Sequence, residues 1–140
     1  MRVYRSIPTI KAMTFDLDDT LYDNRPVILR LESEVYQWIA RHYPKCQLIT
    51  KDDWLTFKYL ARVNNPNLAS DVTLLRRAQL ALGLAHVGYD EADIPGIIDK
   101  IMEQVLHWRH QIDIPDETHQ VLSQLSKRMP LVAITNGNVY

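Results

Sequence analysis

The sequence predicts an α/β protein with a doubly wound parallel core, only part of which is present, and an inserted helical domain. Two short apolar runs, at 10–17 and 130–135, have the length and composition of strands buried in a parallel sheet. Five segments between them repeat apolar residues every three or four positions, as amphipathic helices do. The order of the elements is therefore strand, five helices, strand.

The first strand is expected to end at Leu17, because 18–24 is rich in turn-forming residues. A helix follows from Pro26 to Tyr43, with the proline in the first turn, where its missing N–H costs nothing. Thr50 and Asp53 have the spacing of a capping box at the start of the next helix. The remaining helices are expected at 52–63, 70–84, 91–110 and 115–127. All three tryptophans lie in the first four helices, which indicates a small core of their own.

The composition excludes several classes of protein. Apolar residues make up 46% and charged residues 24% of the 140, which is typical of a globular chain. The net charge of -1 shows no excess of basic residues of the kind that binds nucleic acid or an anionic membrane. No apolar run approaches the roughly 20 residues that a membrane span needs. A single cysteine, Cys46, favours a reducing, cytoplasmic location and a structural role for its thiol.

The strongest chemical signal is the segment 15–20, FDLDDT, at the end of the first strand. Asp16 and Asp18 are two residues apart, so the strand repeat points both carboxylates to one side. Ligands of open parallel sheets bind at the carboxyl ends of the strands. Paired hard oxygen ligands suit Mg²⁺ with waters and a phosphate. The competing interpretation is a solvated turn or a helix cap.

The second signal follows the last strand, in the segment 134–137, ITNG. The hydroxyl of Thr135 and the backbone N–H of Asn136 would form a small cradle for an anion. By itself, a strand that ends in Thr-Asn-Gly is common in turns. Together with the aspartates of 15–20, it predicts a phosphate site.

FDLDDTLYD and ITNG resemble the first two motifs of the haloacid dehalogenase-like hydrolase superfamily. The helices between them resemble its inserted helical cap. The resemblance implies a Rossmann-like core at 1–22 and 113–140, and a cap at 23–112. The segment 14–30 is most similar to bacterial flavin-pathway phosphatases. It implies a small phosphorylated metabolite as substrate, either 5-amino-6-(5-phospho-D-ribitylamino)uracil or FMN.

The same resemblance implies roles for individual residues in Mg²⁺-dependent phosphomonoester hydrolysis. Asp16 would be the nucleophile that forms an aspartyl-phosphate, and Asp18 the general acid and base. The Asp16 carboxylate and the Asp18 carbonyl would bind Mg²⁺. Thr135 and Asn136 would hold the phosphate. Tyr22 is a candidate to line the entrance.

The chain also departs from the superfamily pattern. A lysine and a later acidic pair should follow the second motif, and the sequence given ends at Tyr140. We therefore expect no turnover from these 140 residues alone. Two alternatives remain: a non-catalytic truncated product or helical interaction module, and a phosphosugar mutase of the same superfamily.

Overall fold

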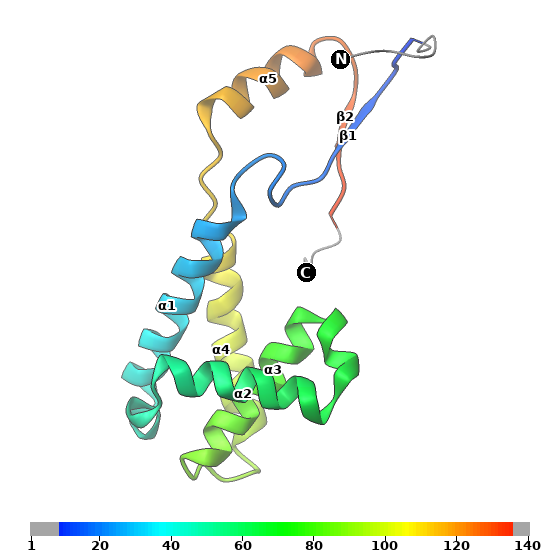
Figure 1. Ribbon diagram of the computed structural model, residues 1–140. Helices are drawn as coiled ribbons and strands as arrows, with labels where there is room; N and C mark the ends of the chain where they lie inside the picture. Colours follow the sequence, from blue (N-terminus) through cyan, green and yellow to red (C-terminus); the bar gives the residue numbers. More distant parts are fainter. Residues whose placement is uncertain (1–8, 136–140) are drawn as a thin grey trace. The chain divides into compact units, whose positions relative to one another are not determined.

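The computed structural model describes residues 9–135, which divide into two compact units (Figure 1). One unit consists of 9–26 and 112–135, and the other of 27–111. The sequence predicts a division at 22/23 and 112/113, whereas the structure divides the chain at 26/27 and 111/112. The first boundary falls inside the first helix, which begins at Asn24. No helix in the described residues is long and apolar enough to cross a membrane.

The first unit is built on a pair of parallel strands. Strand β1, Met13–Phe15, pairs with β2, Leu131–Ala133, and Met13 lies opposite Leu131. Helix α5, Asp116–Ser126, precedes β2 and packs beside it. Both strands are shorter than expected. The predicted parallel order is confirmed, and the fold is the incomplete α/β core that the sequence predicts.

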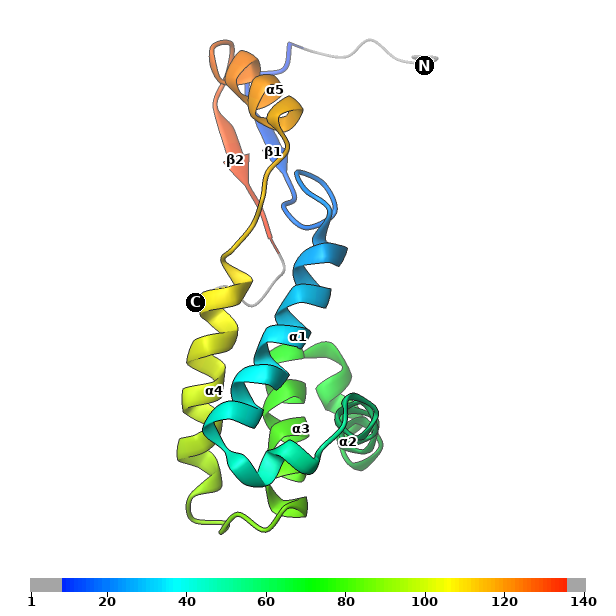
Figure 2. The ribbon, with the colours of Figure 1, turned by 90° about the vertical axis from the view of Figure 1, so that its left-hand side faces the viewer.

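The second unit is built from the helices between β1 and α5 (Figure 2). In chain order they are α1 (Asn24–His42), the 3₁₀ turn η1 (Pro44–Leu48), α2 (Lys51–Asn64), the 3₁₀ turn η2 (Pro66–Ser70), α3 (Val72–His86) and α4 (Ile94–Arg109). Helix α2 packs on α3, and α3 packs on α4. Each predicted helix is present, with ends that differ by a few residues.

The helical unit has a dense core. Helix α1 buries Val27, Leu31, Val35 and Ile39, one residue per turn, as an amphipathic helix does. The Trp54 ring is 2% exposed and stacks parallel to Tyr36, with ring centroids 5.5 Å apart. Apolar side chains from all four helices join this cluster, so the predicted separate core is confirmed.

Local signals set the ends of α2 and α3. The Thr50 hydroxyl accepts a hydrogen bond from the Asp53 N–H at 3.2 Å, and the Asp53 carboxylate accepts one from the Thr50 N–H at 2.8 Å. This confirms the predicted capping box. Asp71 caps α3 by accepting bonds from the N–H groups of Thr73 and Leu74, so α3 begins at Val72 and not at Ser70.

The buried face of α3 differs from the expected one. Val72, Leu75, Ala78 and Leu82 repeat every three or four positions, which predicts one apolar face, yet the Val72 side chain is 65% exposed. The helix buries Gln79 instead, whose amide donates to the Trp54 carbonyl at 2.7 Å and to the Tyr36 hydroxyl at 3.2 Å. These bonds satisfy a polar group that would otherwise be costly to bury.

Gly83 and Gly96 provide a matched test of the core. A Cβ on Gly83 would lie 2.4 Å from the buried Trp54 ring, whereas one on Gly96 would meet nothing within 4 Å. We expect Gly83→Ala to lower the free energy of unfolding by about 1–3 kcal/mol through overpacking. Gly96→Ala should leave it unchanged or raise it by up to about 1 kcal/mol, because alanine favours helix. Urea denaturation measures both, and equal effects would contradict this packing.

Cys46 offers a second test. Its side chain is 2% exposed, and burial raises the pKa of its thiol to about 11. At pH 8 the native thiolate would be roughly one part in a thousand, so disulfide reagents should label the native chain slowly. In urea the same thiol should react at once. Rapid labelling of the native chain would contradict the buried position.

Candidate active site

A tight turn follows β1 and carries the predicted catalytic aspartates. The Leu17 carbonyl accepts hydrogen bonds from the N–H groups of Thr20 at 3.3 Å and Leu21 at 3.0 Å. Asp19 has a φ of 56°, the left-handed conformation that aspartate tolerates better than most residues. The chain therefore reverses within a few residues of the strand end.

Asp18 is held by Tyr22, four residues further on. The Tyr22 hydroxyl donates a hydrogen bond to Oδ1 of Asp18, and the two residues also form an isolated backbone bridge. The Tyr22 side chain is 8% exposed, so its ring is fixed by its surroundings. Because this bond engages one carboxylate oxygen, it sets the orientation of the carboxyl group. The sequence suggested only a lining role for Tyr22.

Asp16 lies directly after β1 and is exposed. Its Oδ2 is 3.5 Å from the Thr20 hydroxyl, which is too long for a strong hydrogen bond. The carboxylate is therefore accessible to a ligand. The structure thus places Asp16 and Asp18 on the same turn, one exposed and one held by a tyrosine.

The other two acidic residues of the turn have a structural role. Asp19 accepts a hydrogen bond from the N–H of Asn24 at 2.9 Å, and Asp23 accepts one from the N–H of Arg25 at 2.9 Å. Both N–H groups belong to the first turn of α1, where no intrahelical partner exists. The helix-cap interpretation of the acidic cluster is therefore correct for these two residues.

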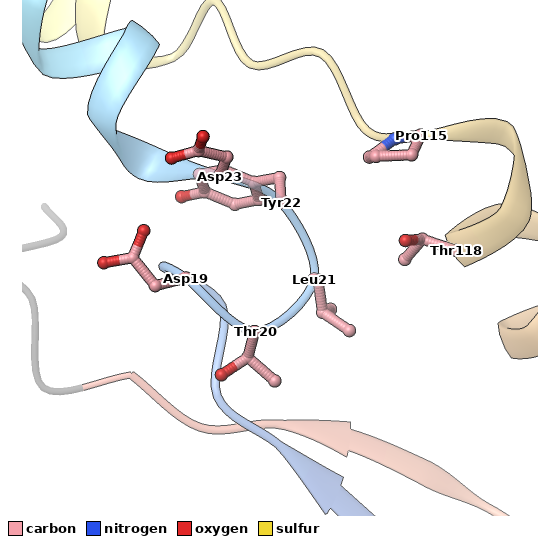
Figure 3. A pocket seen from close by; sticks show the side chains of 7 residues that line it. All are labelled: Asp19, Thr20, Leu21, Tyr22, Asp23, Pro115 and Thr118. Carbon is pink, nitrogen blue, oxygen red and sulfur yellow. The ribbon is translucent and has the colours of Figure 1, made fainter.

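A pocket of about 350 Å³ lies beside this turn (Figure 3). It is lined by Asp19, Thr20, Leu21, Tyr22, Asp23, Pro115 and Thr118. Figure 3 shows Leu21 on the side of Thr118, and the carboxylates of Asp19 and Asp23 on the other side of the turn. Asp16 and Asp18 are not among its lining residues, so this pocket is not the predicted phosphate site.

The end of β2 lies beside the end of β1. The Ile134 N–H donates to the Phe15 carbonyl at 2.8 Å, which continues the pairing one residue past the strand. The next residue on each side is Thr135 and Asp16, and both are exposed. The fold thus brings two predicted site residues from opposite ends of the chain to one sheet edge. The predicted phosphate ligand Asn136 lies outside the described residues.

The described residues supply part of a magnesium site. Carboxylate and carbonyl oxygens at Asp16 and Asp18 are hard donors of the kind Mg²⁺ binds, usually with several waters. Within 9–135, no group of three or more His, Cys, Asp or Glu side chains is placed to hold a metal ion. The donor set therefore fits Mg²⁺ in type, and further ligands would have to come from water, substrate or other residues.

Two known proteins are similar to this chain. The 5-amino-6-(5-phospho-D-ribitylamino)uracil phosphatase YigB of Escherichia coli K12 is 40% identical over 138 residues, which cover 99% of this chain and 58% of the relative. The crystal structure of a 2-haloacid dehalogenase from Pseudomonas syringae pv. Tomato DC3000 superposes with a TM-score of 0.79 at 34% identity, over 94% of this chain and 57% of that one. No protein-family model matches the chain. By the coverages above, the chain spans less than two thirds of the length of either similar protein.

Proposed function

We propose that this chain, which belongs by sequence and fold with the haloacid dehalogenase-like hydrolases, takes part in Mg²⁺-dependent hydrolysis of a small phosphomonoester. The observation that carries the proposal is the turn after β1. It leaves the Asp16 carboxylate open and fixes the Asp18 carboxyl through Tyr22. A nucleophile and a separate acid/base group are what a two-step phosphoryl transfer needs.

In the first step, an Asp16 oxygen attacks phosphorus while the ester P–O bond breaks. The departing alkoxide takes a proton from Asp18, and an aspartyl-phosphate remains. In the second step, Asp18 takes a proton from a water molecule whose oxygen attacks phosphorus, and Asp16 leaves as a carboxylate. One acid/base group thus serves both halves of the reaction.

The remaining ligands stabilise charge. The Thr135 hydroxyl would donate to a phosphate oxygen at the neighbouring strand end, and Asn136 would be the second phosphate ligand. The Asp16 carboxylate and the Asp18 carbonyl would hold Mg²⁺, whose positive charge would offset the repulsion between the attacking carboxylate and the phosphate. Positioning and charge stabilisation account for most of the acceleration in phosphoryl transfer.

Asp18 also favours a phosphatase over a dehalogenase. A halide leaves as a stable anion and needs no proton, whereas an alkoxide does. A carboxyl group whose orientation is fixed by the Tyr22 hydroxyl is suited to proton transfer. The structural neighbour is a dehalogenase, so it does not itself favour a phosphatase. The feature that favours a phosphatase is the proton that Asp18 can supply to an alkoxide.

The substrate class follows from the Escherichia coli relative, which is a phosphatase for 5-amino-6-(5-phospho-D-ribitylamino)uracil. We propose this compound or FMN as the substrate, in the cytoplasm and within flavin metabolism. The near-zero net charge supports a small-molecule partner and not a nucleic acid. For the 140 residues alone we propose no turnover, because the lysine and acidic pair implied by the resemblance are not among them.

A first prediction concerns the nucleophile. In a C-terminally extended chain, Asp16→Asn should abolish phosphate release from FMN and from p-nitrophenyl phosphate, because an amide is a poor nucleophile. EDTA should abolish the activity of the unaltered protein, and Mg²⁺ should restore it. A malachite green assay measures both.

Asp52→Asn is the matched control, because this carboxylate lies on α2 in the helical unit. Its activity should equal that of the unaltered protein. Ordinary turnover by Asp16→Asn would refute the mechanism. Isomerisation of a sugar phosphate without phosphate release would point to the mutase alternative.

A second prediction concerns Tyr22. Tyr22→Phe keeps the ring and removes only the hydroxyl that orients Asp18. We expect kcat for FMN, an alkyl ester, to fall about tenfold, with KM little changed. For p-nitrophenyl phosphate the loss should be smaller, because nitrophenolate leaves without a proton and only the second step still depends on the orientation of Asp18.

Tyr59→Phe, at a tyrosine 66% exposed on α2, controls for a general effect of losing a phenol. Equal losses on the two substrates would show that Tyr22 has only a structural role.

A further inference from the structure

Arg76 on α3 is a partly buried guanidinium that no other side chain pairs with. Its neighbour Arg77 forms an ion pair with Asp99, with 2.6 Å between Nη2 and Oδ1. Among residues 9–135, Arg76 makes neither an ion pair nor a hydrogen bond. Burial is the main cause that lowers the pKa of Arg76, so the charged form is held there at a cost. Such a group is normally paired, which makes Arg76 a candidate for binding a ligand.

The Tyr36 hydroxyl is a second donor beside Arg76. The Tyr36 ring stacks on the buried Trp54 ring, and Gln79 donates a hydrogen bond to the Tyr36 oxygen at 3.2 Å. In the described part of the chain, the hydroxyl proton itself has no acceptor. Arg76 is three residues before Gln79, so both project from the same side of α3. Burial raises the pKa of Tyr36 and the charge of Arg76 opposes this rise, as expected for neighbouring groups.

Two further charged side chains lie next to these donors. Nζ of Lys58 on α2 is 3.8 Å from Oε1 of Glu32 on α1, and the two side chains are 30% and 16% exposed. Glu32 is four residues before Tyr36, so it lies one turn away on the same side of α1. Its charge affects the pKa values of Tyr36 and Arg76, yet it forms no ion pair with Arg76. The cluster thus contains two cations and one carboxylate, which leaves an excess of positive charge.

We propose that Arg76, Lys58 and the Tyr36 hydroxyl form a binding site for a small anion, through a carboxylate or a phosphate group. A guanidinium presents parallel N–H donors whose spacing matches two oxygens of either group. The Tyr36 hydroxyl adds a neutral donor, and Lys58 adds a second positive charge. All three residues belong to the helical unit, on α1, α2 and α3. A nucleic acid or an anionic membrane would require rows of basic residues, whereas one arginine and one lysine match a small anion.

Glu32 distinguishes this site from an ordinary salt-bridge network. An arginine that served only to neutralise Glu32 would be expected to pair with it directly, as Arg77 pairs with Asp99. Glu32 instead makes a long contact with Lys58, and the Arg76 guanidinium is left unengaged within 9–135. A carboxylate close to a bound anion repels it. Removal of the Glu32 charge should therefore strengthen anion binding.

Thermal melts of the 140-residue chain, followed by tryptophan fluorescence, test the proposal. All three tryptophans lie in the helical unit, so the signal reports the unit that contains the cluster. The probes are inorganic phosphate and acetate, with ionic strength held constant by KCl. At about 50 mM, the anion that fits should raise the melting midpoint of the unaltered chain by about 4 °C or more. The larger of the two shifts identifies the site as one for phosphate or for carboxylate.

Arg76→Met and Arg77→Met are matched variants at adjacent arginines. Without either probe, Arg76→Met should melt about 2–4 °C above the unaltered chain, because an apolar side chain of similar length avoids the cost of an unpaired charge. It should also lose the shift that the anion causes. Arg77→Met should keep that shift, because Arg77 is engaged with Asp99. Circular dichroism shows whether each variant is folded, and Arg76→Gln serves the same comparison if Arg76→Met is not.

Two variants test the other members of the cluster. Tyr36→Phe keeps the stacked ring and removes one donor, so it should weaken anion binding about threefold. Glu32→Gln removes the repelling charge and should tighten anion binding about fivefold. The dependence of the melting midpoint on anion concentration gives both Kd values.

Three results would overturn the proposal. A shift of equal size in the unaltered chain and in Arg76→Met would be a general effect of salt. Equal losses of the shift in Arg76→Met and Arg77→Met would show a non-specific attraction to basic residues. A Glu32→Gln variant that is less stable and binds anions no more tightly would show that Arg76 only neutralises Glu32.

Discussion

The parallel pairing of β1 with β2 is the constraint on which the candidate site depends. Three residue pairs and the Ile134–Phe15 hydrogen bond bring Asp16 and Thr135 from opposite ends of the chain to one edge. Parallel strands cannot be joined by a tight turn and need a long connection. Here that connection includes the whole helical unit. The site therefore exists only where the two ends of the chain meet.

The turn after β1 determines how each carboxylate near the candidate site is held. Its four carboxylates have different tasks because their surroundings differ. Asp19 and Asp23 cap the start of α1, Tyr22 holds Asp18, and Asp16 stays open. Two carboxylates thus stabilise the turn that carries the two proposed catalytic aspartates. These hydrogen bonds also reduce the repulsion between the carboxylates. Backbone N–H groups and the Tyr22 hydroxyl donate to them and so stabilise their negative charge.

Sequence reasoning succeeded where the signal was local. The Thr50–Asp53 capping box depends on residues three apart, and the strands could be located from their composition and the turns that follow them. It was less successful where a side chain makes its contacts with a different helix or turn. Val72 fits the apolar repeat of α3 but is exposed, because the contacts of Gln79 with Trp54 and Tyr36 determine which face is buried. The bond from Tyr22 to Asp18 depends on the left-handed turn at Asp19, which the sequence does not reveal.

The large buried core and the candidate site lie in different units. Among the described residues, the largest fully buried side chains, Trp54 among them, lie in the helical unit, whereas α5 buries no residue completely and Val132 and Ile134 are half exposed. A two-stranded sheet this short is marginal in water. All three tryptophans lie in the helical unit, so their fluorescence reports its unfolding and not the state of the site. A folded helical core and an intact pair of strands are therefore separate conditions, and the candidate site depends directly on the second.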